Sequence, residues 1–245
     1  MARAPDARLA QRVLSPPLYR ALRHVFAQEP AGCMLVGGTA LAGYYAGHRR
    51  SDDLDLFVRD QSALRAAVGA VEALTRLGAV LHPRQRTPQF YDATCELSDH
   101  AFTVQVVVDA PLHQVGQLSR AKDGVSVATL ETLLKQKAAT LVSRCSEKDL
   151  YDLQWLLQAH SDLKLDALVA LGSQIDGGMT AESAVVSLVG ATLRRAACDF
   201  SIAQDSAAVY QDITTLRKSL VQAFEKLARK EPIGAFGDLV RSLKT

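Results

Sequence analysis

The sequence predicts an α+β protein in which a mixed part of strands and helices is followed by a helical part. Up to about residue 115, short apolar or β-branched runs alternate with segments of helical spacing. Beyond Pro111 the character changes, and apolar residues recur at helical spacing. A chain of 245 residues forms one large domain or two small ones. We therefore expect two domains, 1–115 and 116–245, with the boundary in the segment 111–124.

The predicted elements of the first part alternate in type. Residues 1–15 are expected to form a frayed or weakly helical arm, and a helix starts at Ser15, since prolines are tolerated in a first turn. Asp60 is a typical helix cap and Gly78 a typical helix end. In chain order we expect a helix to about residue 28, strand 33–36, helix 39–46, strand 54–58, helix 62–77, and a hairpin of strands 90–97 and 101–109.

The second part is predicted to consist of helices. Its apolar residues recur every three or four positions, as on the buried face of an amphipathic helix. The expected helices cover residues 129–144, 147–158, 163–175, 182–198 and 206–229.

The composition excludes several classes of protein. The four cysteines lie far apart, without a CxxC pair or a cluster with histidine, so neither a zinc site nor a disulfide framework is expected. Reduced thiols fit a cytoplasmic protein best. The N-terminus lacks the apolar core of a signal peptide, and the longest uncharged stretch, 31–47, is too short and too polar to span a bilayer. We expect a soluble, cytoplasmic protein with no membrane partner.

The most informative motif joins a glycine pair to two aspartates. Gly37 and Gly38 follow a strand-like run and precede a helix, so their backbone N–H groups can approach an anionic ligand. Asp53 and Asp55 are separated by one apolar residue within a strand, which places both carboxylates on one face. Two such carboxylates repel each other unless a cation lies between them, and Mg²⁺ prefers carboxylate, water and phosphate oxygens. The motif indicates a site for a nucleoside triphosphate and a divalent metal, and hence phosphoryl or nucleotidyl transfer.

Other side chains in this region are candidates for the same ligand. Thr39 and Ser51 can offer hydroxyl groups to phosphate or metal. Asp52 should point away from its two acidic neighbours, so we expect it to be exposed or paired with Arg49 or Arg50.

A second group of charged residues lies on a predicted helical hairpin. Lys137 and Arg144 are two helical turns apart and share a face. Lys148, Asp149 and Asp152 follow at the start of the next helix, with the two acids one turn apart. The group is either an ordinary surface hairpin with salt bridges, or a set in which cations neutralise a triphosphate. In the second case an aspartate orients the lysine or assists the attacking hydroxyl.

These two motifs resemble those of a known family. The stretches from Gly37 to Leu41 and from Arg50 to Phe57 are similar to the signature of the nucleotidyltransferase superfamily. The later residues from Lys137 to Leu153 are similar to the lysine and aspartate motifs of the AbiEii/AbiGii toxin family. Members of that family are nucleotidyltransferase toxins of bacterial toxin–antitoxin and abortive-infection systems. The resemblance covers roughly residues 30–160.

The resemblance implies a fold, a reaction and a set of site residues. The implied fold is a polymerase-β-like minimal core, a small mixed sheet with flanking helices, followed by a helical bundle that contributes to the active site. The implied reaction transfers a nucleotide from an NTP to an acceptor hydroxyl of tRNA or another RNA, with Mg²⁺ or Mn²⁺ as cofactor and an antitoxin protein as partner. The implied catalytic residues are Asp53, Asp55, Lys137, Asp149 and Asp152, of which Asp53 and Asp55 hold the metal. The implied nucleotide-binding residues are Gly37, Gly38, Thr39, Ser51, Arg144 and Lys148.

The chain departs from the superfamily at one position. Many members carry a third carboxylate on a later strand, but in the predicted strand 101–109 no acid lies mid-strand. Alternation places Gln105, Val107 and Asp109 on one face of that strand. Three interpretations stay open: the site works with two carboxylates, Asp109 or Glu96 supplies the third, or the site is degenerate.

Two other functions compete with an enzyme that acts on RNA. A non-catalytic module that binds nucleotide or a protein would fit the missing acid. A nucleotidyltransferase with a small hydroxylated acceptor, as in antibiotic nucleotidyltransferases, would fit the net charge of only +2. A clustered basic face would favour RNA, and its candidate residues are Arg84, Arg86, Arg120, Arg144, Arg194 and Arg195.

Overall fold

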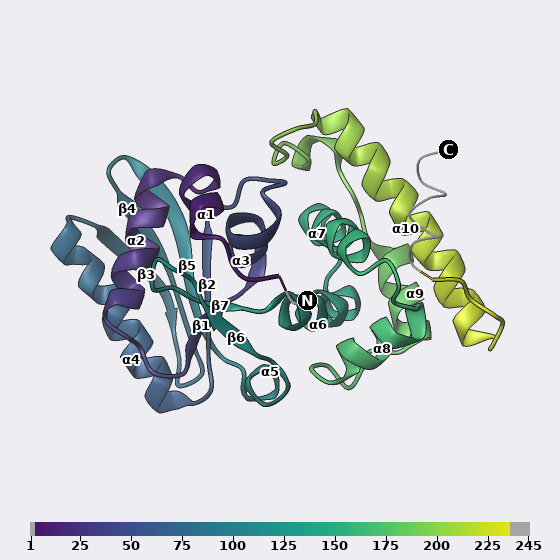
Figure 1. Ribbon diagram of the computed structural model, residues 1–245, viewed down its shortest axis with the longest axis horizontal. Coiled ribbons are helices and arrows are strands. Elements are labelled where there is room, and N and C mark those ends of the chain that lie inside the picture. Colours follow the sequence, from purple (N-terminus) through teal and green to yellow (C-terminus); the bar gives the residue numbers. More distant parts are fainter. Residues whose placement is uncertain (1–2, 236–245) are drawn as a thin grey trace. The chain divides into compact units, whose positions relative to one another are not determined.

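The structure is a computed structural model that describes residues 3–235. The chain divides into two compact units, Met1–Leu133 and Leu134–Thr245. The first unit contains a sheet with flanking helices, and the second is helical (Figure 1). This confirms the predicted α+β class. No helix within residues 3–235 is both long and apolar enough to cross a bilayer.

A seven-stranded mixed sheet forms the centre of the first unit. In spatial order its strands are β3 (Val80–Arg86), β4 (Phe90–Leu97), β5 (His100–Val108), β2 (Asp53–Val58), β1 (Cys33–Leu35), β7 (Ser126–Ala128) and β6 (Leu118–Arg120). β2 is parallel to β5 and antiparallel to β1, and β1 is parallel to β7. The register pairs Asp53 with Thr103 and Asp55 with Gln105, which fixes the neighbours of both aspartates.

The two faces of this sheet differ in what covers them. Burial alternates along β2, with Leu54, Leu56 and Val58 fully buried and the residues between them half-buried. The sheet contacts α2 (Pro16–Ala27) and α4 (Gln61–Glu72), which lie together on one side of it (Figure 1). This apolar layer anchors β2, so the alternate residues of the strand, both aspartates among them, project from the opposite face.

Local sequence signals set the ends of these helices. Ser15 Oγ caps α2 by accepting a hydrogen bond from Leu18 N at 3.4 Å, and Asp60 Oδ1 caps α4 by accepting one from Ala63 N at 2.8 Å. α4 continues as a 3₁₀ turn and ends at Gly78, whose left-handed backbone (φ +83°) suits glycine. The predicted helix 62–77 is thereby confirmed.

Several elements of the first unit differ from the sequence-based prediction. α1 (Ala7–Val13) is a regular helix where a frayed or weakly helical arm was expected, and α5 (Ala110–Val115), which was not predicted, follows β5 directly. β3 is an exposed edge strand whose sequence, with Pro83 and two arginines, looks like a loop. β6 and β7 have three residues each, too few to show alternation. Because β7 pairs with β1 and β6 with β7, the first unit extends to Leu133, further than the domain 1–115 expected from the sequence.

Two buried tyrosines tie the helix at the glycine pair to the β6–β7 hairpin. α3 (Gly37–Leu41) opens at that pair and continues as a π-helical turn. Tyr44 donates a hydrogen bond to Asp123 Oδ2 at 2.9 Å, and Tyr45 donates one to the Ala128 carbonyl at 3.0 Å. Burial, followed by the charge of Asp123, raises the pKa of Tyr44, so its hydroxyl remains a donor.

The second unit is built from helices. They are most of α6 (Leu130–Ser143), then α7 (Glu147–Ala159), α8 (Leu165–Ser173), α9 (Ala181–Gly190) and α10 (Ser206–Ala228). α10 contacts α7, α8 and α9 through a face of buried leucine, isoleucine, valine and phenylalanine side chains. The predicted helix 182–198 is too long. α9 ends at Gly190, where glycine disfavours helix, and a 3₁₀ turn at Arg195–Ala197 follows.

Candidate active site

β2 positions the two predicted metal ligands. Asp53 and Asp55 are half-buried on the face of the sheet opposite α2 and α4, while Leu54 between them is fully buried. Leu54 helps to fix the strand, because a slip of one residue would turn both carboxylates into the core. The two carboxylates therefore share a strand face, as the alternation predicts.

Gly37 lies directly against the carboxylate of Asp55. Its backbone is left-handed (φ +67°), a conformation that favours glycine. A Cβ atom at this position would overlap Asp55 Oδ2, so any larger residue would displace the acid or the loop. Val36 N donates a hydrogen bond to the Asp55 carbonyl at 2.9 Å, which holds the start of the loop against β2. The close approach of loop and acid therefore requires glycine here.

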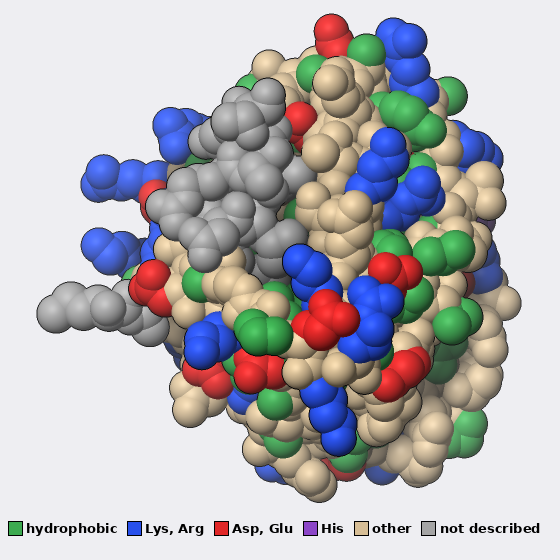
Figure 2. Space-filling view, turned by 90° about the vertical axis from the view of Figure 1, so that its right-hand side faces the viewer, with side chains coloured by type: hydrophobic (Ala, Val, Ile, Leu, Met, Phe, Trp, Pro, Cys, Tyr) green, Lys and Arg blue, Asp and Glu red, His purple; other side chains and the backbone are tan. Residues whose placement is uncertain are grey.

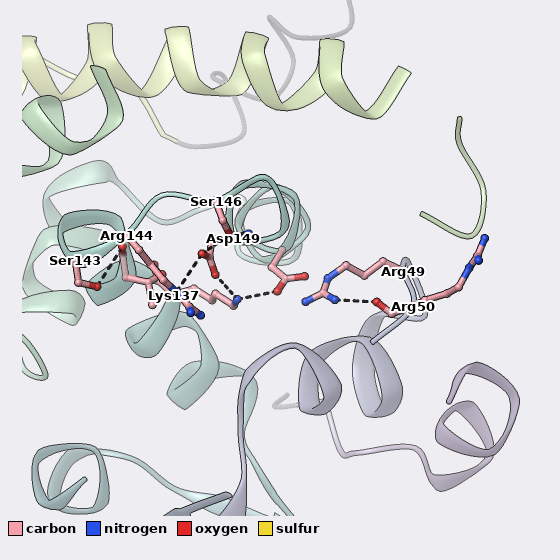
Figure 3. Close-up of polar contacts among 9 residues, drawn as sticks. Arg49, Arg50, Lys137, Ser143, Arg144, Ser146 and Asp149 are labelled. Atoms are coloured by element: carbon pink, nitrogen blue, oxygen red, sulfur yellow. Dashed lines mark hydrogen bonds and ion pairs between the residues drawn. The ribbon is translucent and has the colours of Figure 1, made fainter. Parts of the chain in front are cut away.

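Gly38 makes room for a buried arginine. A Cβ atom on Gly38 would overlap Nη2 of Arg49, a residue that is only 2% exposed. Arg49 Nη1 donates a hydrogen bond to the Arg50 carbonyl at 2.9 Å (Figure 3). The glycine pair thus adjoins a carboxylate through Gly37 and a guanidinium through Gly38. Arg49 was not predicted as a site residue from the sequence. The only sequence feature that could have indicated it is its position in the pair Arg49-Arg50 shortly before the aspartates.

Thr39 and Ser51 connect the loop to the strand. Both are buried, and the Thr39 hydroxyl lies 2.9 Å from Ser51 Oγ and donates a hydrogen bond to the Asp53 carbonyl. These contacts join the first turn of α3 to the start of β2. Contact of either hydroxyl with phosphate or metal stays a prediction.

The strand beside β2 gives the two aspartates neutral neighbours. The Thr103 hydroxyl donates a hydrogen bond to Asp53 Oδ1, and Gln105 is in register with Asp55 on the same face. Neither Thr103 nor Gln105 was proposed as a site residue from the sequence. Among residues 3–235, no group of three or more His, Cys, Asp or Glu is placed to hold a metal ion.

The two candidates for a third carboxylate have partners elsewhere. Asp109 Oδ1 caps α5 by accepting a hydrogen bond from a backbone N–H of that helix at 2.8 Å. Glu96 lies on β4, which β5 separates from β2, and its Oε1 is 3.8 Å from His82 Nε2. Asp52 is exposed, as expected, and its Oδ1 lies 3.2 Å from His100 Nε2.

The oxygen donors at β2 suit a hard divalent cation. Mg²⁺ is usually bound by one or two carboxylates and keeps waters and substrate phosphates as its remaining ligands. Asp53 and Asp55 supply two carboxylates on one strand face, and Mn²⁺ accepts the same oxygen ligands. The residues present therefore fit the metal that the motif implies.

In the second unit, Lys137 is enclosed by two carboxylates. Its Nζ lies 2.8 Å from Asp149 Oδ1 and 2.8 Å from Asp152 Oδ2, and none of the three side chains is more than 5% exposed. Ser146, the cap of α7, donates from Oγ to Asp149 Oδ2 at 2.6 Å (Figure 3). α6 supplies the lysine and α7 the two acids. The group is a buried ion cluster, not the surface salt bridge that was one of its two interpretations.

Cations around Asp149 keep this acid ionised. Burial would raise the pKa of Asp149, but the charges of Lys137 and Arg144, with hydrogen bonds to the carboxylate, outweigh burial and lower the pKa. Arg144 Nε lies 3.4 Å from Asp149 Oδ2, although its side chain is 71% exposed. Lys148 is exposed on α7.

Most of the candidate RNA-binding arginines have acidic partners. Besides Arg144 with Asp149, the pairs are Arg84 with Asp92, Arg86 with Glu72, and Arg120 with Glu29. Arg194 and Arg195 are exposed. Figure 2 shows a face on which basic side chains are interspersed with acidic ones. These pairings reduce the positive field that the arginines can offer to RNA.

The lowered pKa of Asp149 predicts a pH-dependent stability. As the pH falls below the ordinary value of 3.8, the unfolded chain takes up a proton that the folded protein does not, so the free energy of unfolding decreases. Wild type should lose more of this free energy between about pH 5 and about pH 3 than Asp149→Asn, measured by urea unfolding. Asp162→Asn, at an exposed aspartate without an ion pair among the described residues, is the matched control and should follow wild type. Equal losses in wild type and Asp149→Asn would contradict the assignment.

Comparison with known proteins identifies the family of the chain. The family model of the AbiEii nucleotidyl transferase toxins of type IV toxin–antitoxin systems matches residues 20–231. The crystal structure of JHP933 from Helicobacter pylori is similar to the chain with a TM-score of 0.52 at 19% identity, over 89% of this chain and 97% of that one. MenT4, a nucleotidyltransferase toxin from Mycobacterium tuberculosis H37Rv, has a TM-score of 0.48 at 14% identity and 98% coverage of both chains. A search of curated proteins gave no significant match.

The family model spans most of both units, so it includes the glycine and aspartate motif as well as the Lys137 cluster. It implies an NTP as substrate and an antitoxin as partner, and it favours an enzyme over a non-catalytic binding module. The likeness to JHP933 concerns the fold and supports the same architecture. The chain belongs to the AbiEii family of nucleotidyltransferase toxins.

Proposed function

We propose that this protein uses Mg²⁺ or Mn²⁺ to transfer a nucleoside monophosphate from an NTP to a hydroxyl of RNA, with tRNA as the acceptor, in the bacterial cytoplasm. The observation that carries the proposal is the pair of carboxylates on one face of β2, of which that of Asp55 lies directly against Gly37 of the glycine loop. The acceptor oxygen bonds to the α-phosphorus, the bond to the bridging oxygen breaks, and pyrophosphate leaves. The hydroxyl proton is released to a base or to solvent.

The residues of the first unit divide these tasks. Asp53 and Asp55 hold the metal, which when bound neutralises phosphate charge and orients the triphosphate. Backbone N–H groups at Gly37 and Gly38, where α3 begins, bind phosphate oxygens. Arg49 brings a positive charge beside Gly38 that stabilises the charge of the transferring group.

Three hydroxyl groups hold this site in shape. Thr39 hydrogen bonds to the backbone of Asp53 and to Ser51, and Thr103 hydrogen bonds to the Asp53 carboxylate. Such bonds restrict the orientation of a metal ligand before metal arrives.

We further assign Lys137, Asp149 and Asp152 to catalysis, with Arg144 and Lys148 binding nucleotide. The motif supports this assignment, and so does the cost of the cluster, because burying three charged groups is expensive. In this assignment Lys137 neutralises phosphate charge while the two acids set its position, and one of them supports the attacking hydroxyl.

The nature of the acceptor separates two versions of the proposal. RNA as acceptor follows from the resemblance to the toxin family, whereas the acidic partners of the arginines leave room for a small hydroxylated acceptor. Incubation with each α-labelled NTP, Mg²⁺ and total cellular RNA, followed by a denaturing gel, distinguishes them. A labelled RNA band supports the RNA version, and label that stays in small molecules supports the other.

Asp55→Asn should abolish transfer without unfolding the protein. Loss of a metal ligand removes several kcal/mol of transition-state stabilisation, so we expect a decrease of at least about 10³-fold in the rate of label transfer. The substitution keeps the volume that faces Gly37, and circular dichroism checks the fold.

Asp52→Asn is the matched control for that variant. Asp52 precedes the same strand but is exposed, so transfer should stay near the wild-type rate. Undiminished transfer by Asp55→Asn, or an equal loss in both variants, would contradict the assignment of the metal site.

Lys137→Arg tests the cluster of the second unit. Arginine keeps the positive charge but not the compact ammonium that contacts both acids, so we expect transfer to fall about 10²-fold. The rate and the urea unfolding midpoint are measured together, with Lys218→Arg on the exposed side of α10 as control. A folded Lys137→Arg protein with the wild-type rate would show that the cluster is structural only.

A further inference from the structure

One neutral side chain occupies the position beside Asp55 where an acid would complete a stronger metal site. Gln105 on β5 is in register with Asp55 on β2, and these two strands are parallel neighbours. Neighbouring strands lie about 4.8 Å apart, so paired residues on one face lie side by side. Burial alternates along β5 as it does along β2, with Gln105 half-buried between the fully buried Val104 and Val106. Gln105 therefore shares the face of the two aspartates.

The neighbours of Gln105 on this face already have polar partners. Thr103 hydrogen bonds to the Asp53 carboxylate. Asp92 is in register with Gln105 on the far side, on β4, and its Oδ1 accepts a hydrogen bond from Arg84 Nη2 at 2.6 Å. The Gln105 amide, in contrast, makes no side-chain hydrogen bond to any residue that the structure describes. It is a half-buried polar group beside Asp55 whose hydrogen-bonding capacity is open to a ligand or water.

A glutamine at this position limits the charge of the site. Asp53 and Asp55 carry two negative charges, which match one divalent cation without excess. The affinity of oxygen sites for divalent cations rises with the number of charged ligands, and Mg²⁺ loses its waters reluctantly. A site of two carboxylates and one amide therefore holds the metal weakly by itself. It holds the metal firmly only when the phosphates of a nucleotide add their oxygens.

We propose that Gln105, by adding no charge to the site, makes retention of the metal depend on bound nucleotide. Resting on the proposed function, this inference assigns metal and NTP to one joint binding event. The free enzyme then stays largely metal-free, and the metal leaves with pyrophosphate after transfer. Gln105→Glu would separate metal binding from nucleotide binding, because a third carboxylate next to Asp55 retains the metal without nucleotide.

The test is a titration with Mn²⁺ followed by electron paramagnetic resonance, in which the signal of free Mn²⁺ falls on binding. Wild type should bind Mn²⁺ alone weakly. With an equimolar mixture of non-hydrolysable analogues of the four common NTPs it should bind much more Mn²⁺ than the same analogues bind without protein. Gln105→Glu should bind Mn²⁺ alone at least about tenfold more tightly than wild type. Gln105→Asp, with a shorter side chain, provides a second variant if the first does not fold.

Two controls locate the effect. Gln85→Glu makes the same chemical change on β3, in register with Asp92 but separated from β2 by β4 and β5, and should leave Mn²⁺ binding unchanged. Adding Asp55→Asn to Gln105→Glu should remove the gain, because the site then again has only two carboxylates. Folded variants at position 105 without a gain, or an equal gain in Gln85→Glu, would overturn the inference and leave the proposed function intact. Failure of wild type to bind Mn²⁺ even with nucleotide would overturn the proposed function and the inference with it.

Discussion

The contact between the Gly37 backbone and the Asp55 carboxylate constrains the rest of the first unit. The loop approaches the acid so closely that no Cβ atom fits, and the left-handed backbone of Gly37 makes that approach possible. The carboxylate of Asp55 is thereby held beside the backbone of the Gly37–Gly38 loop. Buried apolar side chains on the other side of β2 keep the acid there. The sheet thus supports Asp55 against the glycine loop, to which we assign phosphate binding, with Asp53 on the same strand face.

The second unit also holds two acids close together, but it pairs them with a cation from the chain itself. In the first unit the acids lie half-buried, where a cation from solution can reach them. In the second, Asp149 and Asp152 are fully buried and their cation is Lys137, a part of the chain. Removing one member of a buried cluster typically costs about 3–5 kcal/mol, because it leaves an uncompensated buried charge, so a substitution here lowers stability whether or not the cluster takes part in catalysis. A role in catalysis must therefore be measured separately from stability.

Some of this site could be predicted from sequence because it follows from periodicity and residue chemistry. Alternation alone places Asp53 and Asp55 on one face, and the predicted helical hairpin places Lys137 and Asp149 on neighbouring helices. The neutral partners on β5 depend on strand order and register, and the burial of Arg49 depends on its packing against Gly38, neither of which a local pattern encodes. The short strands β6 and β7 were missed for the same reason, since only pairing in the folded sheet defines them.

The position of the metal is the most direct test of the central claim, that the two acids of β2 and the glycine loop form one site for metal and nucleotide. Crystals of the wild-type protein grown with Mn²⁺ and a non-hydrolysable NTP analogue give an anomalous difference map that locates the ion. The predicted peak lies about 2.0–2.3 Å from carboxylate oxygens of Asp53 and Asp55, with the phosphates extending toward Gly37 and Gly38. A peak elsewhere, with a nucleotide that does not contact the glycine loop, would contradict this account.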